Sequence, residues 1–453
     1  MLKHLQHENK IDMLHGSLLD KILIFSIPLA LSMMLQQLFN AADVAVVGRF
    51  DSPQAMAAVG SNGAAINLFV NLFVGISIGA NVVVANLIGT GEKRKIHDAV
   101  HTAIYMSFIS GIFLLFAGIL AAIPLLSLMN TPDDIMELAV LYFRIYFLGM
   151  PFIMLYNFAS AVLRSMGDSK RPLFCLSIAG VINVILNLIL VIGFKMGVSG
   201  VAIATVISNI VSSLMSINYL SHEEEPFTFR VKELMIKKEY VKQMLKIGLP
   251  AGLQGMLFSV SNVTIQTATN GLGSYVSAGS AAALNFDFFT YFVCAAFTQA
   301  VVTFTSQNFG AKNYTRCRSI YRLTMVSALF FNGLVCLLCY LFRYELISFF
   351  STDSEVMKYA DVRMVYAVAF LWMTNLYEIS GGALRGMGYS TLPAVIILLG
   401  CCVLRIIWVY TVFQIYGTFE SLILVYPVSW GITGIVTLFF YYKIRKDISS
   451  IRI

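Results

Sequence analysis

The chain has 453 residues, of which 58% are hydrophobic and 12% charged, and its formal net charge is +7. A soluble chain with about half the usual share of charged residues could not cover its surface with polar groups, so soluble, disordered and disulfide-scaffold classes are excluded. The composition predicts a protein that crosses a membrane many times.

Twelve apolar stretches are long enough for membrane-spanning helices, which need about 20 apolar residues each. No cleavable signal is expected at the N-terminus, because the first apolar run leads into polar residues. In chain order the predicted spans are 21–47, 54–84, 98–126, 134–163, 172–194, 199–220, 242–269, 275–305, 317–349, 355–384, 391–415 and 418–442.

The distribution of Lys and Arg predicts the orientation. Of the 31 basic residues, 24 fall at the termini and in alternate loops, and four fall in the opposite loops. Positive residues concentrate on the cytoplasmic side, so both termini are expected in the cytoplasm. This bias explains the net charge without nucleic-acid binding. Three arginines remain within spans: Arg144, Arg363 and Arg405. We expect Arg144 and Arg363 to snorkel toward the surface and Arg405 to bond to carbonyls or an acid.

The chain also contains an internal repeat. Residues 163–172 (LRSMGDSKRP) and 384–393 (LRGMGYSTLP) match at six of ten positions with an offset of 221, and Pro28 pairs with Pro250 at 222. The expected fold class is all-α integral membrane, with twelve transmembrane helices in two pseudo-symmetric six-helix lobes that form a parallel repeat. The predicted lobes are 1–220 and 241–453, joined by a cytoplasmic linker, 221–240, whose Glu223–Glu225 run is expected to be solvated.

Catalytic motifs are absent from the sequence. It has no HExxH, GxSxG or Walker pattern, and we find no metal-ligand grouping among its six histidines. Two lobes without such motifs indicate a transporter that is not an enzyme and needs no cofactor. Energy would then come from an ion gradient, or the protein would equilibrate its substrate passively.

Three acids, Asp43, Asp287 and Glu378, lie within predicted spans, where an isolated charge costs a few kcal/mol. A carboxyl that is costly in its charged form suits a site that carries a proton or a cation. Pro28 precedes Asp43 in the same span and can kink that helix. The alternative is a structural carboxyl satisfied by polar neighbours, especially for Glu378 near a helix end.

Polar residues follow in the fifth and sixth spans. Asn183 and Asn187 are one helical turn apart, and Thr205 lies in the next span. These side chains can ligate a cation or bond to a carboxyl, although hydrogen bonding between helices is an equal alternative.

Several segments resemble the multidrug and toxic compound extrusion (MATE) family. They are residues 42–49 (ADVAVVGR), 57–60 (AAVG), the two LRxMG segments, and Asn183 followed by 197–208 (GVSGVAIATVIS). The second LRxMG segment with its Tyr389, and residues 426–430 (YPVSW), are similar to the DinF-like bacterial branch.

The resemblance implies a twelve-helix antiporter in the bacterial inner membrane. Such proteins export organic, often cationic, compounds in exchange for H⁺ or Na⁺. The family's cation site maps onto Asp43, Asn183, Asn187 and Thr205, and its helix hinge onto Pro28. One departure is that Asn187 stands where the family has an Asp, so the site keeps one carboxylate. Coupling then rests on Asp43 alone, or on Asp43 with Asp287 and Glu378 in the second lobe.

Substrate is expected to contact polar residues that stand on otherwise apolar helices. The expected partners are small organic substrates and the lipid bilayer, with no nucleic acid, and the chain is expected to be a monomer. Alternative functions are a lipid-linked oligosaccharide flippase of the same superfamily, a membrane-embedded enzyme and a passive channel. The cavity candidates are Gln37, Asn40, Asn67, Asn71, Asn262, Gln266 and Asn285.

Overall fold

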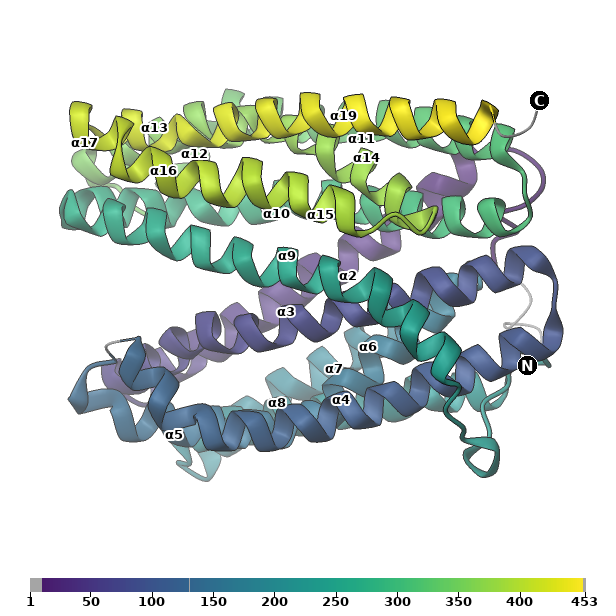
Figure 1. The fold of residues 1–453 in the computed structure, drawn as a ribbon. Coiled ribbons are helices and arrows are strands. Elements are labelled where there is room, and N and C mark those ends of the chain that lie inside the picture. Colours follow the sequence, from purple (N-terminus) through teal and green to yellow (C-terminus); the bar gives the residue numbers. More distant parts are fainter. Residues whose placement is uncertain (1–9, 130, 451–453) are drawn as a thin grey trace. The chain divides into compact units, whose positions relative to one another are not determined.

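The computed structural model describes residues 10–129 and 131–450, and this part of the chain is helical without strands (Figure 1). The first half consists of α2 (Leu19–Phe50), α3 (Pro53–Thr90), α4 (Lys93–Leu128), α5 (Asp133–Leu148), α6 (Met150–Ser165), α7 (Lys170–Asn187), the π-helical turn η1 (Leu188–Gly193) and α8 (Gly197–Ser221).

The second half follows a short 3₁₀ turn, η2 (Val231–Glu233), in the linker. Its elements are α9 (Lys238–Gly271), α10 (Ser274–Gly310), α11 (Tyr314–Leu341), α12 (Arg343–Ser348), α13 (Ser354–Tyr366), the 3₁₀ segment η3 (Val368–Met373), α14 (Thr374–Gly386), α15 (Thr391–Ile397), the π-helical turn η4 (Leu398–Val403), α16 (Leu404–Tyr410), α17 (Val412–Tyr416), α18 (Phe419–Ile423) and α19 (Val425–Ser450).

The helices sort into two compact units. Unit 1 contains residues 10–16, Ile27–Gly252 and Gly310–Lys312, and unit 2 contains Ser17–Ser26, Leu253–Phe309 and the chain from residue 313. The units do not begin and end where the predicted lobes do. The first turns of α2 belong to unit 2, and the first half of α9 belongs to unit 1. Each of these helices therefore changes unit beside a proline, Pro28 in α2 and Pro250 in α9.

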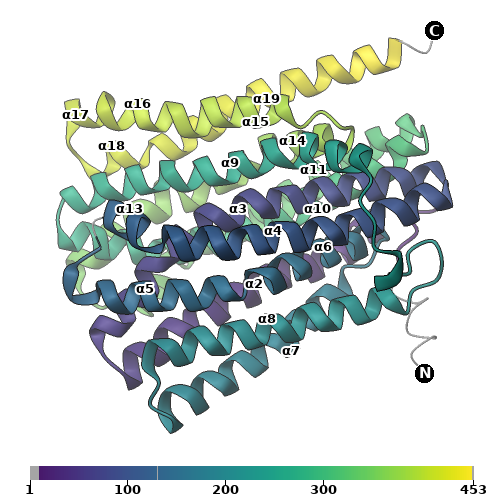
Figure 2. The ribbon, with the colours of Figure 1, turned by 60° about the horizontal axis from the view of Figure 1, so that its bottom comes forward.

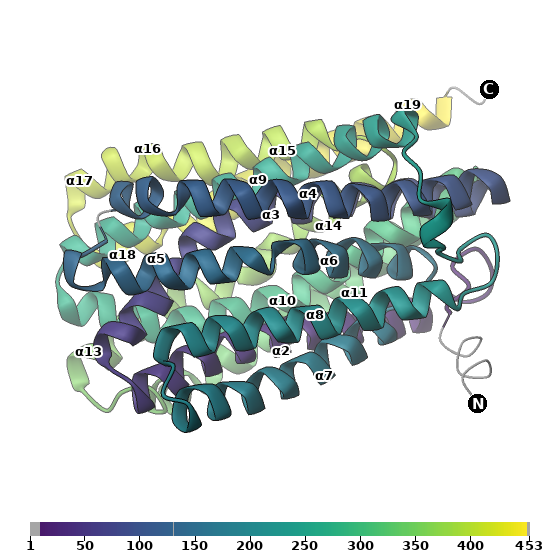
Figure 3. The same cartoon turned by 90° about the horizontal axis from the view of Figure 1, so that it is seen from below.

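Within unit 1, α6 packs between α4 and α8, and α7 packs on α8, as Figure 3 shows from below. The apolar core of this unit contains Phe143, Phe147 and Met154, all fully buried. Large apolar side chains also face outward on α4, where Leu120 is 77% exposed. A soluble protein would not leave such a surface uncovered, whereas lipid covers it at no cost.

Within unit 2, α14 packs on α19 and α11, and α15 lies against α19 (Figure 2). Its core contains Tyr377, Ile397 and Phe419. Polar residues are also buried here, among them Arg363, Glu378 and Arg405.

Local sequence signals explain where helices begin, end and bend. Ser52 caps α3 by accepting a hydrogen bond from the Ala55 backbone N–H at 3.1 Å, with Pro53 at the first helical position. Gly91 ends α3 in the left-handed conformation with φ of 73°. The predicted span 134–163 is a bent pair, α5 and α6, with an angle of 48° at Gly149.

Nine helices in the described part of the chain are long and apolar enough to cross a membrane, and the bent pair α5–α6 makes ten. The two other predicted spans appear as α9 and as α13–η3–α14. These are more polar, and they occupy the repeat positions of α2 and α5–α6. The fold is thus an all-α membrane protein with two six-helix repeats, as predicted.

Candidate functional site

Unit 1 brings together the four residues predicted to bind the coupling ion. Asp43 projects from α2, Asn183 and Asn187 from α7, and Thr205 from α8. Asn187 Nδ2 donates to Asp43 Oδ1 over 2.6 Å, and Thr205 Oγ1 donates to Asp43 Oδ2 over 3.0 Å. Each carboxylate oxygen thus has its own donor from a different helix.

The two asparagines complete this network. Asn183 Nδ2 donates to Thr205 Oγ1 over 3.3 Å, and Asn187 Nδ2 also donates to Asn183 Oδ1 over 3.2 Å. Asn187 Oδ1 is buried and has no hydrogen-bond partner. A buried amide oxygen without a donor is costly, and it can act as a cation ligand beside the carboxylate.

No basic side chain neutralises this carboxylate. Asp43 is 5% exposed, and among the described residues no Lys, Arg or His nitrogen lies within 4.0 Å of it. Val47 and Val201 lie one helical turn from Asp43 and Thr205, and with Tyr142 of α5 they belong to the buried apolar core of unit 1. A lone charge in such surroundings is strongly favoured to bind a proton or a cation.

The acids of unit 2 have different surroundings. Arg363 donates to Asp287 Oδ2 through Nε over 2.9 Å and through Nη2 over 2.5 Å, and its Nη1 reaches Ser280 Oγ at 2.9 Å. Arg363 therefore does not snorkel as expected but forms a buried ion pair. Glu378 accepts a hydrogen bond from Tyr291 Oη over 3.3 Å. Of the three acids, Asp287 is paired and Glu378 has one neutral donor.

Arg405 is 2% exposed, and its surroundings correct our expectation for it. In the described part of the chain its side chain makes one hydrogen bond, from Nε to Ser429 Oγ over 3.1 Å, and none to a carbonyl or an acid. Its guanidinium carbon lies 4.6 Å from the ring centre of Tyr426, 5.6 Å from Phe258 and 5.9 Å from Trp430. Within the described residues no carboxylate oxygen lies within 4.0 Å of it, so its nearest stabilising groups besides Ser429 are aromatic faces.

The cavity candidates are dispersed over each unit. Asn40, Asn67 and Asn262 are exposed, whereas Gln37, Asn71, Gln266 and Asn285 are half-buried. Gln266 bonds to Asn270 and Asn285 to carbonyls of its own helix. Their role in substrate contact remains a prediction.

Unit 1 contains two polar clusters that the sequence patterns did not predict. The Glu223 carboxylate is not solvated but buried, with Lys10 Nζ and Arg171 Nη1 each at 2.5 Å, and Arg171 also pairs with Asp168. The ion pairs of Glu223 could not be predicted from the sequence, because Lys10 is 213 positions and Arg171 is 52 positions away from it.

The second cluster joins α4 to the linker. His97, His101 and Glu233 have potential metal-ligand atoms within 4.8 Å of one another, a grouping that the sequence had not indicated. His101 Nε2, however, already accepts the Arg230 backbone N–H at 3.2 Å. Hydrogen bonds from Arg230 and His97 hold the pKa of Glu233 below its usual value. The cluster therefore docks the linker on α4 through hydrogen bonds.

Comparison with known proteins gives consistent matches over most of the chain. A sequence profile of the MatE family matches residues 28–189 and 250–411. The chain is 28% identical over 433 residues to the probable multidrug resistance protein YoeA of Bacillus subtilis, covering 93% of this chain and 92% of that protein. It is 22% identical over 436 residues to the multidrug export protein MepA of Staphylococcus haemolyticus, covering 96% and 95%.

Solved structures have the same fold. A crystal structure described as MATE in the bent conformation superposes with a TM-score of 0.88 at 20% identity, covering 97% of this chain and 98% of that one. An outward-facing multidrug resistance transporter of the same family gives 0.89 at 21% identity, with the same coverage.

The two profile matches also align the halves of the chain. They start and end 222 residues apart, so that Asp43 corresponds to Ile265 and Asn183 to Arg405. The LRxMG turns just before this pair match at 221, and the π-helical turns explain the local change to 222. A π turn accommodates one extra residue, and η4 precedes Arg405, whereas η1 follows Asn183. After both turns the offset returns to 221, which pairs Thr205 with Tyr426. The acid and amide of unit 1 are thus replaced in unit 2 by an apolar residue and a guanidinium.

Proposed function

The chain belongs to the MatE family of multidrug transporters, and from this premise we propose that it is a secondary active antiporter. It exports organic, often cationic, compounds in exchange for H⁺ or Na⁺ by alternating access. The proposal includes a bacterial cell membrane location with both termini in the cytoplasm, and no enzymatic activity.

The observation that carries this proposal is the buried, uncompensated carboxylate of Asp43. Its two oxygens are held by donors from α7 and α8, while the carboxylate itself belongs to α2. A proton or Na⁺ on Asp43 neutralises the carboxylate, and the hydrogen bonds that Asn187 and Thr205 donate to it then become weaker. Ion binding therefore changes how strongly α2 is held against α7 and α8.

The oxygen atoms around the site support either ion. Besides the carboxylate, Asn183 and Asn187 supply amide oxygens and Thr205 supplies a hydroxyl. Hard cations prefer such all-oxygen surroundings. A single carboxylate can also bind one proton. Export under separate pH and Na⁺ gradients distinguishes the two ions.

The first experiment measures export of ethidium, an organic cation, from proteoliposomes under separately imposed pH and Na⁺ gradients. Antiport predicts that a gradient of one ion, directed opposite to ethidium movement, accelerates export. Equal export rates with and without either gradient would overturn the proposal of ion coupling.

The second experiment locates the coupling site. Asp43→Asn should abolish gradient-driven export while the protein remains folded and inserted, because the change removes a costly buried charge. The matched variants are Asp287→Asn and Glu378→Gln, which remove the other two acids. If Asp43→Asn exports at the wild-type rate and one of these variants does not, the coupling site lies in unit 2.

A further inference from the structure

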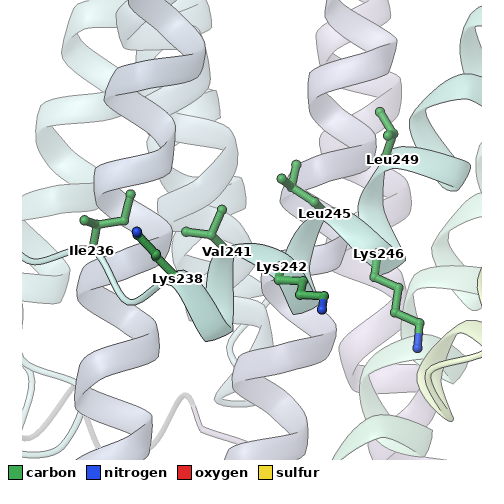
Figure 4. Close-up of a pocket in the computed structure, with 7 residues that line it drawn as sticks. All are labelled: Ile236, Lys238, Val241, Lys242, Leu245, Lys246 and Leu249. Carbon is green, nitrogen blue, oxygen red and sulfur yellow. The ribbon is translucent and has the colours of Figure 1, made fainter.

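The end of the linker and the start of α9 line a shallow groove with a volume of about 480 Å³ (Figure 4). Every residue that lines it belongs to unit 1 and comes from the end of the linker or the first part of α9. The lining residues are Ile236, Lys238, Val241, Lys242, Leu245, Lys246 and Leu249.

Two adjacent stripes give the groove its chemistry. Lys238, Lys242 and Lys246 repeat every four residues and lie on one side of the helix, with Leu245 and Leu249 on the neighbouring side. At 1.5 Å per residue, the stripes run for roughly 16 Å along α9. The leucines are 36% and 41% exposed, so an apolar surface is open beside a row of positive charges.

The lysines have no acidic partner in the described part of the chain. No carboxylate oxygen lies within 4.0 Å of any of the three, and the nearby Glu239 bonds to Gln243. Positive charge near a helix N-terminus is also disfavoured by the helix dipole. The three lysines are therefore available to bind an anion that is not part of the protein.

The lysine row is specific to the second half of the chain. At the offset of 222 that pairs Pro28 with Pro250, the three lysines correspond to Gly16, Asp20 and Ile24. The equivalent helix of the first half thus lacks the positive stripe. A general need for positive charge at this side of the membrane would not distinguish the two helices in this way.

We propose that this groove binds an anionic phospholipid of the cytoplasmic leaflet. The phosphate lies on the lysine row, and one acyl chain lies along Val241, Leu245 and Leu249. Lysines near an anionic lipid surface strengthen binding about fivefold each, and on the order of a hundredfold for three. This lipid site is separate from Asp43; its placement in the cytoplasmic leaflet rests on the orientation proposed above, whereas lipid binding itself is independent of ion coupling.

The test is native mass spectrometry of the full-length protein released from vesicles of equal parts phosphatidylcholine and phosphatidylglycerol. The wild type should retain phosphatidylglycerol in preference to phosphatidylcholine. The triple variant Lys238→Gln/Lys242→Gln/Lys246→Gln should lose most of this preference. Leu245→Ser/Leu249→Ser should also weaken retention, because it removes the apolar stripe.

The matched control is Lys93→Gln/Arg94→Gln/Lys95→Gln, which removes three exposed positive charges at the start of α4. It should retain phosphatidylglycerol as the wild type does, and thermal unfolding should show all variants to be folded. Equal retention by the lysine variant and the wild type, or equal loss in the α4 control, would overturn the proposal. Displacement of the lipid by inorganic phosphate at equal concentration would also contradict it, since free phosphate has no acyl chain.

Discussion

Thr205 has one hydroxyl proton and two acceptors within reach. Its Oγ1 lies 3.0 Å from Asp43 Oδ2 and 3.0 Å from the Val201 carbonyl oxygen. A charged carboxylate is the stronger acceptor, so the proton is directed to Asp43 while that group is ionised. When Asp43 is neutralised, the hydroxyl can donate instead to the Val201 carbonyl oxygen in its own helix. Thr205 therefore links the charge of Asp43 to the packing of α8.

We expect Thr205→Val to reduce gradient-driven export by at least about tenfold, because a hydrogen bond to a charged group is worth roughly 1.5–3 kcal/mol. Thr205→Ser keeps the hydroxyl and should export at close to the wild-type rate. Initial export rates in proteoliposomes measure both. If the valine and serine variants have equal rates, the hydroxyl is not part of coupling.

Arg405 offers a second prediction at this scale. Arg405→Ala should lower the unfolding temperature, since it empties a space lined by Tyr426, Phe258 and Trp430. Guanidinium ion at millimolar concentration should restore part of that loss in the variant and leave the wild type unchanged. A thermal shift assay measures the difference. The same response in both proteins would show that the aromatic side chains do not hold a cation.

At the scale of elements, α2 and α9 are the helices that change unit within their length, each beside a proline. Proline in a helix interior removes one backbone hydrogen bond and costs about 3 kcal/mol. A helix weakened at that position bends more readily there than elsewhere. We therefore expect that the alternating access proposed above bends α2 and α9 at these two prolines.

Pro28→Ala should slow transport while raising or preserving thermal stability, because it restores a backbone donor and stiffens α2. Pro124→Ala is the matched control, since Pro124 lies inside α4, which is wholly within unit 1. Its transport rate should stay near that of the wild type. Equal slowing in both variants would mean that helix stiffening in general, rather than bending at Pro28, limits transport.

Hydropathy identified most of the twelve spans directly, because ten of them are local runs of apolar residues, and the internal repeat supports the two more polar ones, α9 and α13–η3–α14. It did not predict the bend at Gly149 or the π-helical turns, which depend on how neighbouring helices pack. The ion pairs between distant residues could not be predicted from the sequence either. Asp287 and Arg363 are 76 positions apart, and Arg171 is 52 from Glu223, so nothing in the sequence pattern connects them. The Asp43 site was predictable through its family resemblance, but its hydrogen bonds were not.

At the scale of the whole molecule, the predicted orientation can be tested at the two LRxMG turns. Ser169 and Ser390 are only 1% and 2% exposed, so they are poor labelling sites. Lys170 and Tyr389 are exposed next to them. Lys170→Cys and Tyr389→Cys should react with a membrane-impermeant thiol reagent from the cytoplasmic side alone.

Lys195→Cys is the control for the opposite face, because Lys195 is exposed in a loop predicted to lie outside. It should react from the external side. Labelling of Lys170→Cys and Tyr389→Cys from different sides would contradict a parallel repeat of six spans.

The replacement of Asn183 by Arg405 between the two halves has an electrical consequence. A guanidinium fixed to the chain stays where it is in every cycle, so unit 2 moves no ion at that position. If the proposed antiport uses Asp43 as its one exchange site, each substrate molecule sent outward is exchanged for one positive charge brought inward. With a singly charged organic cation, the charge carried inward by the ion and the charge carried outward by the substrate cancel. Transport then carries no net current, and its rate does not depend on the membrane voltage. With a neutral substrate the same cycle moves one charge inward and is accelerated by a negative interior, so the current measured with different substrates counts the ions that move.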